Sequence, residues 1–365
     1  MSGPLSTTEV GLSLLTIVVG GGTACQATIN WEVAEHFALR LFAAFLNLFS
    51  GLLLLTVLCS LESLLLSKPF LKWKRRPSLH HLLPGVCGLC YVLGTVFLLS
   101  QLGPSLFMVL VVAGQLLCAA SLDHFGIGRS EPKRLTPLRM FALAAAVGGA
   151  ALSVSKTLLQ AQDTTPTWVR ALSALGAFGV GCIMVWQALL SRYAAEILHS
   201  RLAATWWSFA VSASLSGLCL LLNYLFASDD SLARFSRRST WDSSSWWMYT
   251  AALFGVAYIA SSIYIPPQTS SQAYFVCLVA GQLTFSGLID HYGFFGRQAK
   301  PIAVQDVCGV AIVLLAAVLM QLPAELCGQL PSLPSLLPAK PDVAPYLELN
   351  LQERLVGERE LPTLE

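Results

Sequence analysis

The sequence predicts an all-α polytopic membrane protein whose ten transmembrane helices form two inverted five-helix repeats. Two observations predict this fold. The chain is 55% hydrophobic and 12% charged, whereas soluble domains carry roughly 25% charged residues. In addition, the segment VLVVAGQLLCAASLDHFG at 109–126 recurs as VCLVAGQLTFSGLIDHYG at 276–293. The basic residues lie in loops and form no stripe interleaved with aromatic residues, so we expect no nucleic-acid partner.

The first half contains five apolar runs, each near the length of about 20 residues that a helix needs to cross a bilayer. The first run follows only one charge, Glu9, and no basic segment, so we expect a retained helix and not a signal peptide. The expected helices are 11–29, 41–66, 82–100, a fourth that follows the turn at Gly103-Pro104 and ends at Asp123-His124, and 138–159.

The second half repeats this order after a polar linker. Its expected helices are 169–190, 202–226, 246–265, 271–289 and 303–322. The domains are therefore a first repeat at 1–160, a linker at 161–168, a second repeat at 169–322 and a tail at 323–365. The tail is proline-rich and acidic, and we expect it to be disordered and cytoplasmic.

The repeat extends beyond its opening segment. Its matched landmarks are Gln26, Glu35 and Arg40 with Gln187, Glu196 and Arg201; Gly88 and Tyr91 with Gly255 and Tyr258; and Gly114, Gln115, Asp123 and His124 with Gly281, Gln282, Asp290 and His291. The pattern indicates that the whole membrane region is a tandem duplication.

The segments Val112-Ala113-Gly114-Gln115 with Asp123-His124-Phe125-Gly126, and Val279-Ala280-Gly281-Gln282 with Asp290-His291-Tyr292-Gly293, resemble the YdcZ-type branch of the drug/metabolite transporter superfamily. Members of that branch usually look like single five-helix units, and this chain is similar to two units fused. The resemblance covers about residues 10 to 321 and implies a carrier of the inner or cell membrane, often described as an exporter. The tail has no counterpart in the unit.

A duplicated unit with an odd number of helices must insert its second copy upside down. Inverted repeats place a substrate site near the bilayer midplane and support alternating access, so we expect a secondary transporter of a small organic solute, an exporter or exchanger. The candidate substrate-binding residues are Gln115, Gln282, Gly114, Gly281, Tyr91, Tyr258, Gln26 and Gln187. The alternative is that the glutamines hydrogen-bond across helix interfaces and the aromatic residues fill grooves between helices.

The Asp-His pairs are expected at opposite faces of the membrane, each beside a hinge of mixed charge. Our hypothesis is that Asp123 with Arg192 or Arg201, and Asp290 with Arg40, form ionic gates that close in turn. The candidate gating residues are Asp123, His124, Arg192, Glu196, Asp290, His291, Glu35 and Arg40. The alternative is that Asp and His cap the helix ends.

We find no constellation of nucleophile, base or metal ligands, so we expect no enzyme, cofactor or metal site. A channel or a scaffold stays open as an alternative function. No Asp or Glu lies near the centre of a predicted helix, which argues against a strongly cationic substrate. The basic loop at 67–81 favours a cytoplasmic location for both termini, in the plasma or inner membrane, with an organelle membrane left open. The expected partners are the substrate and the lipid bilayer, and a homodimer is left open.

Overall fold

The structure is a computed structural model. The described residues are 7–67, 69–74, 77–102, 104–127, 136–153, 167–198, 200–226, 235, 238–299 and 301–321. Within these ranges no strand occurs beyond one isolated bridge between Trp73 and Leu198. The predicted tail and all but Thr167 and Trp168 of the predicted linker lie outside the described residues.

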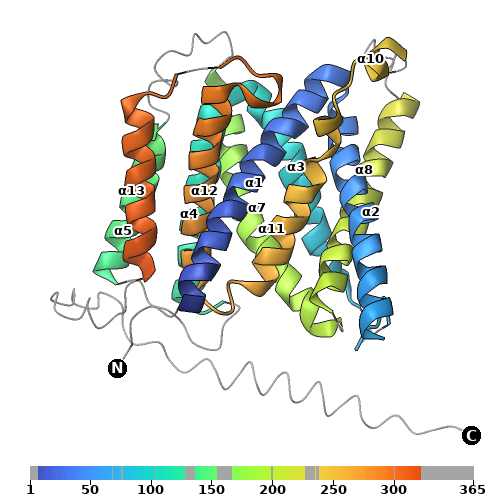
Figure 1. Ribbon diagram of the computed structural model, residues 1–365, viewed down its shortest axis with the longest axis horizontal. Helices are drawn as coiled ribbons and strands as arrows, with labels where there is room; N and C mark the ends of the chain where they lie inside the picture. Colours follow the sequence, from blue (N-terminus) through green and yellow to red (C-terminus); the bar gives the residue numbers. More distant parts are fainter. Residues whose placement is uncertain are drawn as a thin grey trace, which may run out of the picture. The chain divides into compact units, whose positions relative to one another are not determined.

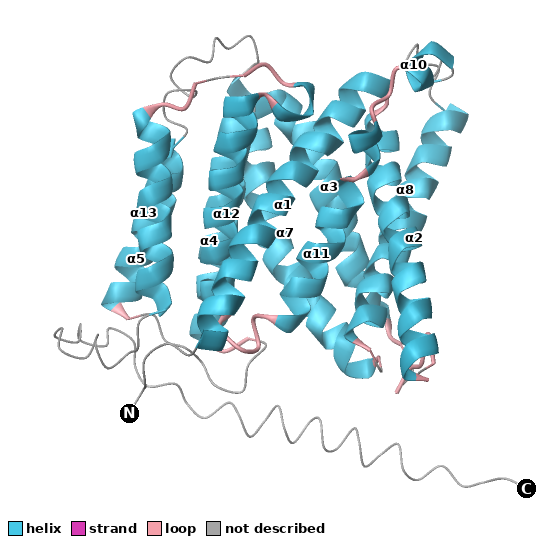
Figure 2. Ribbon diagram, in the orientation of Figure 1, coloured by secondary structure: helices cyan, strands magenta, loops and turns pink. Residues whose placement is uncertain are grey.

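Figures 1 and 2 show the helices of the chain. They are α1 (Thr7–Phe37), α2 (Arg40–Leu66), η1 (Leu79–Leu82), α3 (Leu83–Leu102), α4 (Pro104–Phe125), α5 (Pro137–Ser153), α7 (Thr167–Ile197), α8 (Arg201–Phe226), α10 (Arg238–Asp242), η2 (Trp246–Tyr249), α11 (Ala251–Tyr264), α12 (Ser271–Tyr292), η3 (Phe294–Gly296) and α13 (Val304–Gln321).

Eight of the described helical segments are long and apolar enough to cross a membrane. The two remaining predicted spans correspond to α5 and α13, whose apolar parts are shorter, so the count of ten is not confirmed. The predicted end of the fifth helix at residue 159 lies outside the described residues. These two helices pack against each other at one edge of the bundle, next to α12 and α4 (Figure 1).

The first helix of each half is longer than predicted. The apolar runs predict ends at residues 29 and 190, but α1 continues to Phe37 and α7 to Ile197. The polar residues that follow the apolar run are compatible with a helix, and α1 ends only where Ala38 adopts a left-handed backbone with φ of 54°. Glu35 and Glu196 therefore lie in the last turns of helices and not in hinges.

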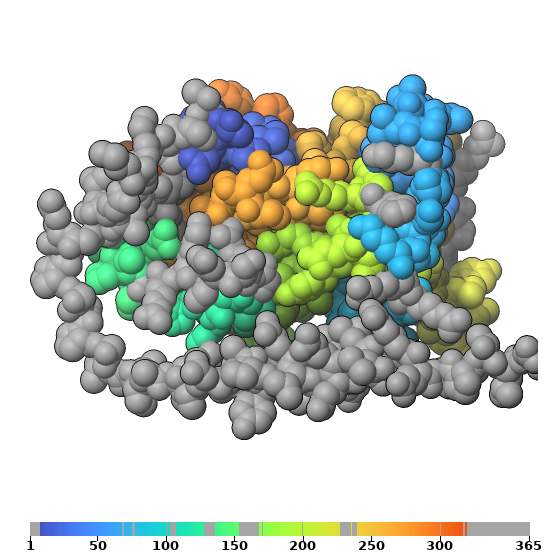
Figure 3. All heavy atoms as spheres, turned by 90° about the horizontal axis from the view of Figure 1, so that it is seen from below, coloured from blue at the N-terminus to red at the C-terminus, as the bar shows by residue number. Residues whose placement is uncertain are grey.

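The two halves pack crosswise. The first helix of each half lies against the fourth helix of the other half: α1 packs on α12, and α7 packs on α4. The first helices also contact the third helices of the opposite halves, α1 with α11 and α7 with α3. The helices α2 and α8 pair with each other on the other side of this centre. Seen from below, the orange residues of the α11–α12 connection lie between the dark blue start of α1 and the lime end of α7 (Figure 3).

Candidate functional site

Two close helix crossings form the centre of the bundle, and each is built on glycine. At the crossing of α1 with α12, a Cβ added to Gly281 would overlap the carbonyl oxygen of Ile17, and one added to Gly20 would overlap the carbonyl oxygen of Leu278. Only glycine allows the two backbones to come this close. Gly281 is one of the candidate substrate-binding residues. In the structure it permits this close contact between the two backbones.

The crossing of α7 with α4 repeats this contact at the equivalent positions. A Cβ on Gly114 would overlap the carbonyl oxygen of Phe178, and one on Gly181 would overlap that of Val111. The duplicated glycines predicted from the sequence are therefore paired with partners in the opposite half.

Gln115 and Gln282 follow these glycines and are buried, with 0% and 2% of their surface exposed. Each is the twelfth residue of a 22-residue helix, α4 or α12. The Gln282 Nε2 donates to Thr23 Oγ1 at 3.0 Å, and the Gln115 Nε2 donates to Met184 Sδ at 2.9 Å. The Oε1 atoms of both glutamines are buried and have no hydrogen-bond partner among the described residues.

Gln26 and Gln187 lie about one turn beyond Thr23 and Met184 on the same helices. Gln26 is packed so closely on α11 that a Cβ on Gly255 would meet its Nε2 at 2.6 Å, and a Cβ on Gly88 of α3 would meet the Nε2 of Gln187 at 2.8 Å. Gln26 also donates to Asn47 Oδ1 at 3.4 Å. The structure therefore places all four predicted glutamines at contacts between helices of the central group.

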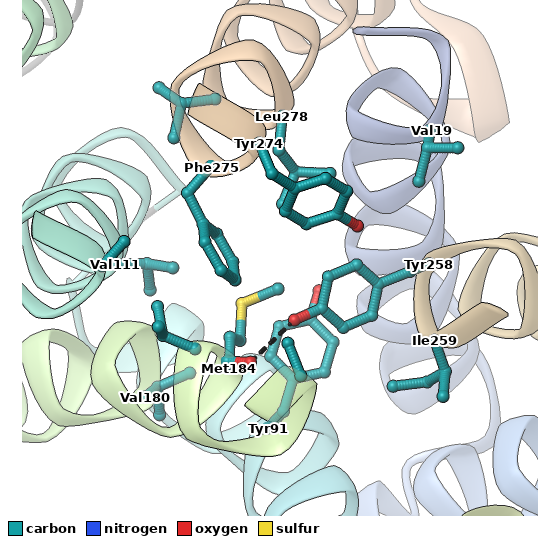
Figure 4. Close-up of a cluster of buried hydrophobic side chains, with 14 of the residues drawn as sticks. Val19, Tyr91, Val111, Val180, Met184, Tyr258, Ile259, Tyr274, Phe275 and Leu278 are labelled. Atoms are coloured by element: carbon teal, nitrogen blue, oxygen red, sulfur yellow. Dashed lines mark hydrogen bonds between the residues drawn. The ribbon is translucent and has the colours of Figure 1, made fainter. Parts of the chain in front are cut away.

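Three buried tyrosines enter the same central region (Figure 4). Tyr258 donates its hydroxyl to the carbonyl oxygen of Met184 at 2.9 Å, and Tyr91 lies beside it. The third is Tyr274, whose hydroxyl is 2.8 Å from Ser261 Oγ. The sequence pattern does not single out Tyr274, because the equivalent residue of the first half is Phe107 and the hydroxyl is therefore not repeated.

Figure 4 also shows what surrounds the tyrosine rings. Phe275 packs edge-on against Tyr274, with ring centroids 5.1 Å apart. Val111 and Leu278, at equivalent positions of the two halves, face the same cluster. The centre is thus aromatic and aliphatic, with amide and hydroxyl groups as its polar content.

Asp123 has a partner that the sequence did not suggest. Its carboxylate oxygens accept hydrogen bonds from the backbone N–H groups of Ser271 at 3.3 Å and Gln272 at 2.8 Å, at the N-terminus of α12. A carboxylate is stabilised at a helix N-terminus by the free N–H groups and the helix dipole. Asp123 is 1% exposed, and it joins the end of α4 to the start of α12.

The other Asp of the repeat is in a different environment. Oδ1 of Asp290 lies 3.6 Å from Nη1 of Arg297, and the Asp290 side chain is 34% exposed. Arg297 also stacks over Trp31, with 5.0 Å to the ring centroid. Arg40, the partner proposed from the sequence, lies over the ring of Phe97 at 5.6 Å.

The remaining predicted gating residues lie near these two helix ends. Glu35 and Glu196 are exposed, and His124 and His291 are half-buried. Arg192 donates through Nε to a carbonyl one turn earlier in α7. Asp123 and Asp290 are therefore brought to helix ends with different contacts, and the gating role of this group stays a prediction.

Eight apolar helices of membrane-crossing length define an integral membrane protein. The family described as "Putative inner membrane exporter, YdcZ" matches residues 11–152 and 172–319. The chain belongs to this family of the drug/metabolite transporters, in two units, as the doubled motif predicted. The description of the family names a transport role at the inner membrane and no enzymatic reaction.

A solved crystal structure is similar in fold, with a TM-score of 0.58 and 17% sequence identity, over 89% of this chain and 99% of that chain. No curated protein matches the sequence. The similarity to the solved structure concerns the fold alone.

Proposed function

We propose that the chain is a secondary transporter that moves a small organic solute across the membrane by alternating access, as an exporter or exchanger. The observation that carries the proposal is the crosswise packing of the two halves at Gly20–Gly281 and Gly114–Gly181. Each half contributes its first and fourth helix to a crossing with the other, so the crossings are equivalent. Two such halves inserted in opposite directions can exchange conformations and open the centre to either side.

The substrate site in this proposal is the region between the crossings. Its residues are Gln115, Gln282, Tyr91, Tyr258 and Tyr274, from α4, α12, α3 and α11. Buried amides with unpartnered oxygens are unfavourable in a membrane protein unless a solute or water reaches them. The membership in an exporter family agrees with a solute path through the same helices.

The test is transport by the purified full-length protein in liposomes. The liposomes are loaded with a ¹³C-labelled small-molecule extract of cells, and solutes that leave are identified by mass spectrometry against protein-free liposomes. A carrier releases a restricted set of solutes with saturation, and external unlabelled solute accelerates the release. Release without saturation or counter-flow would identify a channel. The absence of any release would contradict transport and favour the scaffold alternative.

A further inference from the structure

The orientation of the two central carboxamides is determined by their partners. The hydroxyl of Thr23 already donates to the carbonyl oxygen of Gly20 at 2.8 Å, so it can only accept from Gln282. The thioether sulfur of Met184 carries no hydrogen, so it can only accept from Gln115. In both glutamines the NH₂ group must therefore face the partner, which leaves the Oε1 atom as the free group.

These two acceptor oxygens belong to adjacent antiparallel helices at the same level. The helices α4 and α12 are in contact, and the two glutamines lie at the midpoint of each. One turn earlier on each helix, Val111 and Leu278 face the cluster that contains Tyr91, Tyr258 and Phe275 (Figure 4). A ligand that reaches the glutamine oxygens would therefore have aromatic rings beside it.

Among the described residues, the charged side chain that acts on this region is Arg192, which interacts electrostatically with Tyr274. The buried acidic and basic side chains among the described residues are Asp123, at the end of α4, and His81, in η1 before α3. Arg192 is half-buried and lies eight residues beyond Met184 on α7, so its charge is beside Tyr274 and about 12 Å along the helix axis from the residue that contacts Gln115. An ionic solute bound between the glutamines would thus lose its hydration without gaining an opposite charge at contact distance.

We propose that the carbonyl oxygens of Gln115 and Gln282 receive the N–H or O–H groups of an uncharged solute whose flat apolar part lies against Tyr91, Tyr258 and Phe275. This inference rests on the proposed function and names the substrate class of the same site. The class comprises neutral amides and alcohols that carry an aromatic or aliphatic ring.

The test measures binding to the purified full-length protein by saturation-transfer NMR and competition. Four probes share one ring: benzamide, with two N–H donors; N,N-dimethylbenzamide, with none; benzoate, an anion; and benzylammonium, a cation. We expect benzamide to bind about tenfold more tightly than N,N-dimethylbenzamide, because the methylated amide leaves the acceptors unpaired. Both charged probes should bind more weakly than benzamide.

Two sets of variants connect this preference to the glutamines. Gln115→Met and Gln282→Met keep the length of the side chain and remove the oxygen, so each should reduce the preference for benzamide. Gln115→Glu should shift the preference towards benzylammonium, which a loss of folding cannot do. Gln101→Met is the matched control, since Gln101 is exposed at the end of α3, and it should bind like the wild type.

The outcomes separate this inference from the proposed function. Equal binding of the two amides, tightest binding of benzoate or benzylammonium, no binding of any probe, or an unchanged preference in the methionine variants would each overturn the inference. Selective binding of benzamide without transport of any solute would overturn the proposed function and leave the substrate-class inference standing.

Discussion

Thr23 and Met184 occupy equivalent positions of α1 and α7, yet they offer glutamine very different acceptors. A hydroxyl oxygen is a strong acceptor, whereas a thioether sulfur is a weak one. Replacement of Thr23 by Val keeps the shape and leaves the Nε2 of Gln282 without its partner. We expect Thr23→Val to lower the free energy of unfolding by about 1 kcal/mol, measured as a lower thermal unfolding midpoint in detergent.

Met184→Leu is the matched change in the other half. It removes the weaker acceptor of Gln115 and should lower the unfolding midpoint less than Thr23→Val does. Equal losses for the two variants would mean that packing at these positions, and not the hydrogen bond to glutamine, determines stability.

Asp123 provides a second prediction at the scale of one residue. Asp123→Ala removes the acceptor of two backbone N–H groups at the start of α12, so these amides should exchange with deuterium faster. Asp123→Asn retains an acceptor oxygen but loses the charge that the helix dipole favours, so its exchange should be intermediate. Mass spectrometry of the peptide that contains Ser271 and Gln272 measures the rate.

Asp290→Ala serves as the control for this exchange experiment. Asp290 is at the other end of α12 and contacts Arg297, so its loss should leave exchange at Ser271 and Gln272 unchanged. If Asp123→Ala also leaves that exchange unchanged, then Asp123 does not hold the end of α4 to the start of α12.

The helix crossings permit a prediction at the scale of the element, because α12 contains two glycines in opposite situations. Gly281→Ala would push the added methyl into the carbonyl of Ile17, whereas Gly287→Ala meets no atom within 4 Å. Overpacking of this kind costs about 1–3 kcal/mol, and alanine is favoured over glycine in a helix by up to about 1 kcal/mol. We expect Gly281→Ala to lower the unfolding midpoint and Gly287→Ala to keep or raise it.

A loss of similar size in both glycine variants would contradict the close crossing of α1 and α12. The midpoint from thermal unfolding, followed by tryptophan fluorescence, gives the comparison directly. Since both changes lie in one helix and alter the same atoms, helix propensity cancels between them.

The elements that repeat were predictable and their partners were not. The doubled Gly-Gln pair identifies α4 and α12 in the sequence, and its position within the apolar runs predicts that Gln115 and Gln282 lie at mid-helix. Sequence alone could not pair Gly114 with Phe178 or Gly281 with Ile17, because the residues opposite glycine contribute backbone atoms that carry no sequence signal. For the same reason, the sequence favoured arginine and not the backbone N–H groups as partners of Asp123.

The ends of the helices were predicted less well than their centres. An apolar run determines where a helix crosses a membrane, but it does not determine where the helix stops. The polar last turns of α1 continue the helix because nothing in them opposes it until the left-handed Ala38. The predicted hinge is therefore a helix end, and a proposed gate must be argued from the contacts at that end.

At the scale of the whole molecule, the two ends of the bundle are unequal although the halves are related. At one end the buried Asp123 joins α4 to α12, while at the other the equivalent Asp290 is 34% exposed and faces Arg297. Two inverted halves can exchange such environments, so that a second conformation would bury Asp290 and release Asp123. The structure would then represent one of two related conformations, the one in which Asp123 joins the end of α4 to the start of α12.

This relation predicts that the distances at the two ends change in opposite directions during transport. Spin labels at the exposed Phe125 and Gln268 report the Asp123 end, and labels at the exposed Gln101 and Tyr292 report the Asp290 end. The labels are introduced into a cysteine-free protein that retains transport. When solute is added, double electron–electron resonance should show that the distance at the Asp123 end lengthens while the distance at the Asp290 end shortens. Asp123→Ala weakens the contact between α4 and α12, so it should lengthen the distance at the Asp123 end even without solute. Distances that lengthen together, or that never change while solute is transported, would exclude alternation between two inverted halves, because only exchange of their conformations couples the two ends with opposite sign.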